Sequence, residues 1–343
     1  MKRFLAALLL VPCLAFATPD TDWAAIVAMD AGPTRKPVTQ EDVKLIARQH
    51  LTVQRGLITD FLAKYPNDPN SFDARLRLAA ILATIGKMDG VQQPVDDAMR
   101  MLTELEKMPG VPLAKRADAG FQRVSLYFQS MRGREAEMRG SIVDSARNFA
   151  TKYPGDRRGP RLLVEAATIC DGDPKAKREL LEQARDLSRE EGLNRRIADD
   201  LTRLGLLNQP FAMKFPTIQG KTFDTESPRG FVTVIVFWSA ESPHCLVWLP
   251  EFVRAIRQFP ASNVRVATIA VDSKRADVAR RLKELRMEDW PTFFDGLGWE
   301  SPMARDRGIN SLPTVFVVDR RGVLRSINAR DNYDLVIRRL LRE

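Results

Sequence analysis

The sequence predicts a multidomain chain in which an all-α helical-repeat region precedes an α/β region. Two observations support this prediction. Between residues 37 and 205, apolar residues recur with helical spacing, and one eight-residue motif occurs twice. From residue 232 onward, short apolar runs alternate with amphipathic segments, which is the pattern of a mixed sheet covered by helices.

The first 17 residues have the pattern of a secretory signal peptide. A basic start, Lys2-Arg3, precedes an apolar run over residues 4–16, and small residues end the segment at Ala17. Cleavage there would remove Cys13 and leave two thiols, those of Cys170 and Cys245. We therefore expect an exported protein of the bacterial periplasm or cell envelope. No later segment reaches the roughly 20 apolar residues of a membrane span, and residues 18–36 are expected to be a linker.

The region over residues 37–207 is predicted to be a helical repeat. Residues 61–68 recur at 149–156 with five of eight positions identical, and a weaker copy surrounds Lys107. The motif lysines Lys64, Lys107 and Lys152 are 43 and 45 residues apart, a period suited to stacked helix-turn-helix units. The motif resembles tetratricopeptide-like repeats. Such a region could bind a peptide or protein on a concave surface, or could be a helical spacer.

A second domain is expected over residues 208–343, because Asn208, Pro210, Pro216 and Gly220 interrupt the helical pattern. Strands are predicted at residues 232–238, 264–271, 314–318 and 324–327. Helices are predicted at residues 245–259 and 273–285, with a closing helix from about residue 331. This order of elements indicates an α/β domain.

Five motifs in this second domain identify a family resemblance. The run from Val234 to Cys245, followed by Leu249-Pro250-Glu251-Phe252, resembles the strand, active-site loop and first helix of thioredoxin-like (redoxin) proteins of the TlpA/ResA type. Later family landmarks follow in order at residues 295–299, 308–309, 311–314 and 318–322. The resemblance implies a thioredoxin-like fold and a thiol-disulfide oxidoreductase ancestry with a role in cell redox homeostasis.

The chain departs from that family at the reacting residues. Where the family has Cys-x-x-Cys, this chain has Ser242-Pro243-His244-Cys245, and Glu241 replaces the preceding tryptophan. A serine hydroxyl cannot join a disulfide, so dithiol exchange is expected to be lost and at most a monothiol role remains. Without chemistry, Ser242 and Pro243 simply start a helix, and Cys245 is a small core residue.

Two redox alternatives stay open for Cys245. The thiol could form mixed disulfides with thiol partners or pair with Cys170, with His244 stabilising the thiolate. A less favoured alternative is a peroxiredoxin-like thiol peroxidase, because that class carries Thr/Ser-x-x-Cys at this place. The later motifs favour the TlpA/ResA type.

The resemblance also implies a substrate groove. Family members have a cis-proline at the position of Pro313, beside the active-site loop, and the implied substrate contacts are Trp238, Pro243 and Leu312. The competing hypothesis is therefore a non-enzymatic scaffold that binds polypeptides through its repeats and this groove. The expected partner is a protein or peptide, offering either a thiol or an extended segment.

Composition argues against several other classes. The chain has 53 Lys+Arg against 44 Asp+Glu, but the basic excess is interleaved with acids instead of forming one stripe, so no nucleic-acid partner is expected. Three cysteines and two histidines are too few for a disulfide scaffold or a His-rich metal site. We expect no metal and no cofactor.

Overall fold

The computed structural model describes residues 18–131, 133–227 and 229–343. The predicted signal peptide, residues 1–17, lies outside the described residues. The chain divides into two compact units, Met1–Met138 and Arg139–Glu343. This division falls within a helix, whereas the change from helices to strands comes some seventy residues later, between Gly205 and Lys214. The last helices therefore group with the strands.

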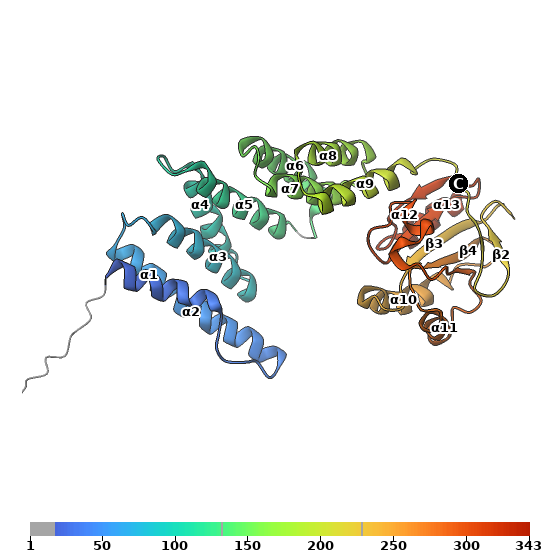
Figure 1. The fold of residues 1–343 in the computed structure, drawn as a ribbon, viewed down its shortest axis with the longest axis horizontal. Helices are drawn as coiled ribbons and strands as arrows, with labels where there is room; N and C mark the ends of the chain where they lie inside the picture. The colour runs from blue at the N-terminus through green and yellow to red at the C-terminus, as the bar shows by residue number, and fades with distance from the viewer. Residues whose placement is uncertain (1–17, 132, 228) are drawn as a thin grey trace, which may run out of the picture. The chain divides into compact units, whose positions relative to one another are not determined.

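The first unit is helical (Figure 1). Its helices are α1 (Pro19–Ala28), α2 (Gln40–Lys64), α3 (Ser71–Asp89), α4 (Gln92–Lys107) and α5 (Leu113–Ser130), with a short 3-10 turn η1 (Met29–Ala31). Within this unit, α2 packs on α3, α3 on α4, and α4 on α5. The expectation of a linker over residues 18–36 is wrong, because Thr18 caps α1 and Ile26 is fully buried beside Ile58 and Phe61.

The repeated motif forms the same turn twice. Helices α2, α4 and α6 (Glu135–Lys152) all end at the motif lysine. In the two strong copies, the aspartates Asp68 and Asp156 each accept a hydrogen bond from the amide two residues on, at 2.8 and 2.9 Å. The rings before each turn also pair alike, with centroids 5.4 Å apart for Phe61–Tyr65 and 5.0 Å for Phe149–Tyr153. Identical residues therefore impose identical local geometry.

The second unit continues with helices and then changes to strands and helices. The helices are α7 (Arg158–Thr168), α8 (Pro174–Leu187), α9 (Glu191–Gly205), α10 (Pro243–Ile256), α11 (Arg275–Glu284), α12 (Pro302–Arg305) and α13 (Tyr333–Arg342), with the 3-10 turn η2 (Gly298–Glu300). The strands are β1 (Lys214–Pro216), β2 (Thr222–Asp224), β3 (Val232–Trp238), β4 (Val264–Ala270), β5 (Thr292–Phe293), β6 (Thr314–Val318) and β7 (Leu324–Ser326). The predicted fold class is confirmed. The short strands β1, β2 and β5 were not predicted.

Five strands form the central sheet in the order β5-β4-β3-β6-β7. Strand β3 pairs in parallel with β4 and antiparallel with β6, with Phe237 opposite Thr314. This register places the residues just before β6 beside the loop that follows β3. Every residue of β3 and β6 is buried, which accounts for their continuous apolar runs.

The two faces of the sheet are covered differently. Alternate β3 residues, such as Val234 and Val236, pack with the apolar faces of α10, α11 and α13. The intervening residues Ile235 and Phe237 pack with the β1–β2 hairpin, α12 and Leu204 of α9. Helix α9 therefore contributes directly to the core of the α/β part.

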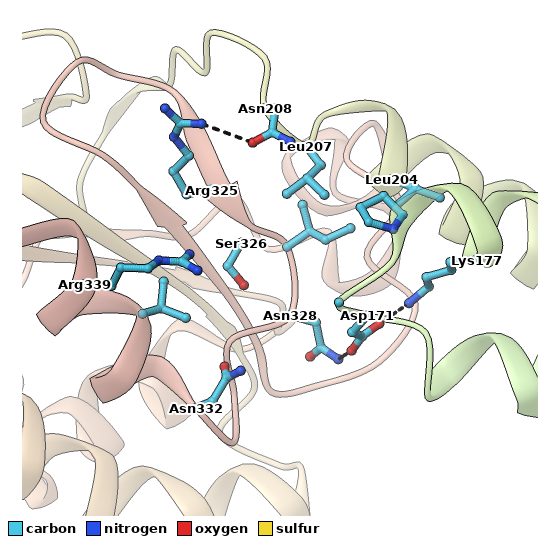
Figure 2. A pocket seen from close by; sticks show the side chains of 14 residues that line it. Asp171, Lys177, Leu204, Leu207, Asn208, Arg325, Ser326, Asn328, Asn332 and Arg339 are labelled. Atoms are coloured by element: carbon cyan, nitrogen blue, oxygen red, sulfur yellow. Dashed lines mark hydrogen bonds and ion pairs between the residues drawn. The ribbon is translucent and has the colours of Figure 1, made fainter. Parts of the chain in front are cut away.

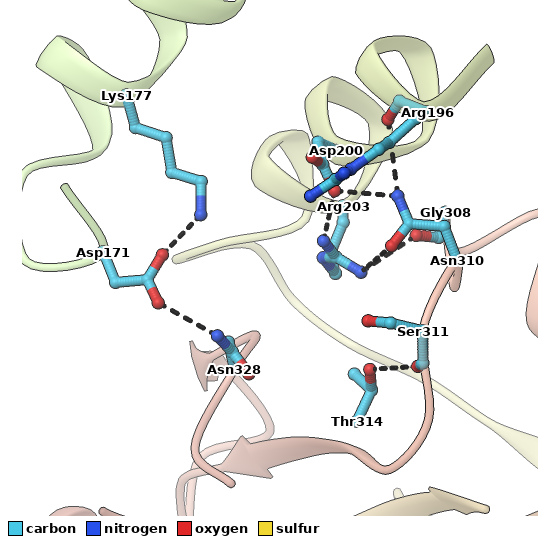
Figure 3. A network of polar contacts seen from close by, with 10 residues as sticks. All are labelled: Asp171, Lys177, Arg196, Asp200, Arg203, Gly308, Asn310, Ser311, Thr314 and Asn328. Atoms are coloured by element: carbon cyan, nitrogen blue, oxygen red, sulfur yellow. Dashed lines mark hydrogen bonds and ion pairs between the residues drawn. The ribbon is translucent and has the colours of Figure 1, made fainter. Parts of the chain in front are cut away.

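Polar contacts also attach α8 and α9 to the α/β part. Asp171, just before α8, accepts a hydrogen bond from Asn328 at 3.0 Å and pairs with Lys177, and Arg325 donates to Asn208 at 3.3 Å (Figure 2). On α9, Asp200 accepts a hydrogen bond from Asn310 at 2.9 Å (Figure 3).

Candidate functional site

The turn from β3 into α10 has the geometry of a helix start. Ser242 is the N-cap of α10, and its hydroxyl accepts a hydrogen bond from the amide of Cys245 at 3.4 Å. Pro243 occupies the first helical position, where its missing N–H leaves no bond unmade. The residue types at the turn therefore place Ser242 at the point where the helix dipole favours negative charge.

A buried carboxylate braces the loop before this turn. Asp272, two residues after β4, accepts hydrogen bonds from the Ser239 hydroxyl at 2.8 Å and from the Ala240 amide at 3.0 Å. Ser239 in turn accepts from the Glu241 amide at 3.1 Å. Burial raises the pKa of the Asp272 carboxyl, and the hydrogen bond from Ser239 partly opposes that shift. Asp272 was not anticipated from the sequence, although a carboxylate directly after a buried strand is a usable signal.

Cys245 lies beneath the surface of the turn. Its side chain is 0% exposed and packs in the core formed with α10, α11 and α13. Burial raises the pKa of the Cys245 thiol, while the Ser242 hydroxyl acts in the opposite direction. A thiol that is both inaccessible and protonated is a poor nucleophile.

No described contact pairs the other candidate redox residues with Cys245. His244 and Glu241 are exposed, and Glu241 lies 3.8 Å from the Lys274 ammonium. Cys170 is fully buried and donates its S–H to the Ala166 carbonyl at 3.5 Å. Both cysteines are free, so the structure contains no Cys170–Cys245 disulfide.

The loop before β6 contains the cis-proline. The Leu312–Pro313 bond is cis, the isomer that the family resemblance implies. Leu312 is half-buried and packs against both cores, whereas Ser311 is exposed. Among the hydrogen bonds of the described residues, none uses the backbone N–H or C=O of Leu312. The strand register places this unpaired backbone beside the Ser242 turn.

Helix α9 holds the same loop from its other end (Figure 3). Arg203, which pairs with Asp200, donates to the Gly308 carbonyl at 3.1 Å and to the Asn310 side chain at 3.3 Å. Gly308 has φ +64°, and a Cβ there would lie 2.1 Å from the Asp199 carbonyl oxygen, so only glycine permits this close approach. The chain leading to the cis-proline is thus fixed by a helix from outside the α/β sequence.

Two exposed apolar side chains border the Asp272 brace. Leu297 is 53% exposed and Trp299 is 51% exposed. Their loop is tied to the brace because the Gly298 amide donates to the Asp272 carbonyl at 3.3 Å. Asp295 supports the loop by accepting from the Leu297 amide at 3.0 Å. An apolar rim therefore lies near the Ser242 turn.

The expected binding residues have different positions. Pro243 is exposed and Leu312 is half-buried. The expectation that Trp238 contacts a substrate is wrong. Its side chain is 0% exposed and packs in the core between the sheet and α10, so it cannot contact a ligand. The reason is the strand alternation, which directs even-numbered β3 residues toward α10.

The contacts of α9 with residues 308–310 could not be predicted from the sequence. Arg203 and Asp200 carry the helical spacing of an ordinary surface ion pair, and nothing in the sequence separates them from the many other such pairs. Only their long-range contact with residues 308–310 gives them a role.

Within the described ranges, no group of three or more His, Cys, Asp or Glu side chains could hold a metal ion. Searching the same residues for membrane spans found no helix of sufficient length and apolarity.

A parallel β3–β4 pair, an antiparallel β6 preceded by a cis-proline, and a helix starting on the loop after β3 together define a thioredoxin-like fold. Residues 208–327 match the model of the AhpC/TSA family. The C-terminal part of the chain is therefore an AhpC/TSA-family (redoxin) domain with a thioredoxin-like fold, and the recognition made from the sequence motifs is confirmed.

Solved structures similar to this part include a thiol-disulfide oxidoreductase from Bacteroides fragilis, at 18% identity and TM-score 0.33, covering 37% of this chain and 96% of that one. A thioredoxin family thiol:disulfide interchange protein from Chlorobium tepidum is also similar, at 21% identity and TM-score 0.33, covering 39% of this chain and 96% of that one. No curated protein matches the chain.

Proposed function

We propose that this protein binds an extended polypeptide segment at the Ser242 turn and the cis-proline loop, and that it has lost dithiol exchange. The observation that carries the proposal is the unpaired backbone of Leu312 beside a turn whose first cysteine is replaced by Ser242. An extended chain can pair with free backbone groups at the edge of a sheet without any covalent step.

The apolar rim supports the same proposal. Leu297 and Trp299 are exposed next to the brace that holds the turn. Large exposed apolar side chains near the turn suit a peptide whose alternate side chains need apolar contact.

A monothiol role for Cys245 is the weaker alternative. Attack on a disulfide requires an accessible thiolate. The full burial of Cys245 and the direction of its pKa shift both oppose that requirement. We therefore favour polypeptide binding over residual redox chemistry.

The leader sequence supports export. The basic start, apolar run and Ala-Phe-Ala end of residues 1–17 fit a cleaved signal peptide, and Thr18 would then begin the mature chain as the cap of α1. Expression of the full chain in a Gram-negative bacterium, followed by N-terminal sequencing of the periplasmic fraction, should yield Thr18. Retention of residues 1–17 would contradict export.

The binding proposal is tested with a permanently unfolded polypeptide, reduced and carboxymethylated α-lactalbumin. We expect Leu312→Asp to weaken binding about tenfold, because a charge in the groove must be desolvated against apolar ligand groups. Leu335→Asp is the matched control, since Leu335 is 67% exposed on α13. Equal binding by wild type and both variants would reject the groove.

The monothiol alternative is tested by labelling. With a maleimide at neutral pH, we expect Cys245 in the folded protein to react at least about 100-fold more slowly than in the unfolded chain. Reaction of native Cys245 at the unfolded rate would restore the monothiol role.

A further inference from the structure

A cavity of about 300 Å³ lies where α8 and α9 meet the β7–α13 segment (Figure 2). It belongs entirely to the second compact unit. None of its lining residues is in the Ser242 turn or the cis-proline loop, so it is a separate feature from the proposed groove.

The charged groups around the cavity leave one unmatched cation. Lys177 pairs with Asp171, and Arg325 pairs with the buried Asp319 at 2.7 Å. Arg339 also lines the cavity, and no carboxylate of the described residues lies within ion-pair distance of it. Asp319 lies outside the lining, and once its pair with Arg325 is counted, Arg339 is the one lining cation that no carboxylate of the described residues neutralises.

Two polar side chains of the lining have no hydrogen-bond partner among the described residues. Ser326 and Asn332 line the cavity on its β7–α13 side (Figure 2). Asn332 is the N-cap residue of α13 but makes no side-chain cap bond. In the part of the chain that the structure describes, the Ser326 hydroxyl makes no hydrogen bond that would occupy it. These groups can donate hydrogen bonds to an anion.

The backbone adds to the positive potential. Pro174, the first residue of α8, and Asn332, the cap of α13, both line the cavity, so two helices begin at its wall. The N-terminal end of a helix carries a partial positive charge. At α8 the Asp173 carboxylate already caps the helix by accepting a hydrogen bond from the Ala176 amide, so only the start of α13 supports the anion preference of Arg339.

The rest of the wall is mixed: Asn208, Asn328 and the paired charges make it partly polar, and aliphatic side chains make the other part apolar. Leu204, Leu207, Ile327 and Val336 line the cavity on both the helical and the α/β side. An inorganic anion would leave this wall facing water. A ligand with one negative charge and a short apolar body satisfies both parts, and the volume suits a group of one or two residues.

We infer that this cavity binds a carboxylate attached to a short apolar body, with Arg339, Ser326 and Asn332 on the carboxylate and the four aliphatic side chains on the body. Two sources have this chemistry: the C-terminal residue of a polypeptide and a free small carboxylic acid.

The experiment uses the full chain and three probes measured by calorimetry: N-acetyl-leucine, the peptide acetyl-Ala-Ala-Leu with a free carboxylate, and the same peptide as its C-terminal amide. We expect the peptide acid to bind with a Kd of about 1 mM or tighter. The amide should bind at least about tenfold more weakly. If N-acetyl-leucine binds as well as the peptide acid, the source is a small acid. If only the peptide acid binds, the source is a polypeptide C-terminus.

Arg339→Gln should weaken the peptide acid about tenfold or more, because it removes the charge-assisted bond. Arg342→Gln removes the same charge one turn later, outside the cavity lining, and should leave the affinity unchanged. Since Arg339 is exposed, its variant should unfold at the wild-type temperature. Asn332→Ala gives an independent check and should weaken binding less than Arg339→Gln. Equal binding of acid and amide, wild-type affinity of Arg339→Gln, or no binding at about 10 mM acid would each overturn the inference.

Discussion

The Ser242 turn and the cis-proline loop lie side by side but are built by different means. The turn is set by local residues: a serine cap, a proline at the first helical position, and a brace from Asp272. The loop is instead fixed by a long-range contact: Arg203 of α9 donates a hydrogen bond to Gly308, which lies 105 residues later in the chain. Short-range contacts therefore fix the turn, whereas a long-range contact fixes the loop.

The largest expected effect comes from introducing a thiol at the Ser242 turn. Ser242→Cys places a thiol at the N-terminal end of α10, where the helix dipole lowers a thiol pKa, with Cys245 available as the resolving thiol. We expect reduction of insulin disulfides by the variant in the presence of dithiothreitol, at a rate at least about tenfold above the uncatalysed rate.

The wild-type protein and Ser242→Ala are the controls for this gain, and neither should exceed the uncatalysed rate. A folded Ser242→Cys variant without activity would mean that the turn and the loop no longer form a working redox groove.

The next effect tests the loop. Arg203→Ala leaves the buried Asp200 without its cation, which should lower the free energy of unfolding by about 3–5 kcal/mol. Hydrogen exchange at residues 308–314 should rise more than exchange at β3, because the loop loses its external support. Urea denaturation and exchange mass spectrometry measure the two effects.

Arg195→Ala in the same helix is the matched control. Arg195 forms an exposed pair with Glu191 at 2.8 Å, and its loss should change stability by less than about 0.5 kcal/mol. A similar result for both variants would show that α9 does not support the loop.

The smallest effect tests the brace of the turn. Because the folded-state pKa of Asp272 is raised by burial, its favourable contribution is present below its unfolded pKa of about 4 and is lost as pH rises through the folded value. The stability of the wild type relative to Asp272→Asn should therefore fall as pH rises from about 4 to 7.

The contribution of Asp319 to stability should have the opposite pH dependence. Burial acts to raise its pKa, but hydrogen bonds from the Val323 amide and Arg325 hold it below the usual value. Its contribution is therefore present above a pH of about 4 and is lost as pH falls, so Asp319→Asn should approach wild-type stability only in acid. Parallel pH profiles for the two variants, from denaturation at several pH values, would contradict this account.

Much of the second domain could be predicted from local pattern. The limits of β3 and β6 agree with the predicted strands residue by residue, because both are continuous apolar runs between polar turns. The helix start at Ser242 also follows from the residue types, since serine caps and proline at the first position are local preferences. The two- and three-residue strands β1, β2 and β5 could not be predicted, because they are too short to show a period.

The sequence by itself determined the fold class, the motif turns and the absence of a second cysteine in the site. Each depends on neighbouring residues or on a residue type, so no distant contact is needed. Only the tertiary structure decided that Cys245 is fully buried, that Trp238 faces the core, and that α9 supports the cis-proline loop. Burial and long-range pairing depend on which surfaces meet after folding, and an isolated Arg–Asp pair in a helix carries no mark of what it will contact.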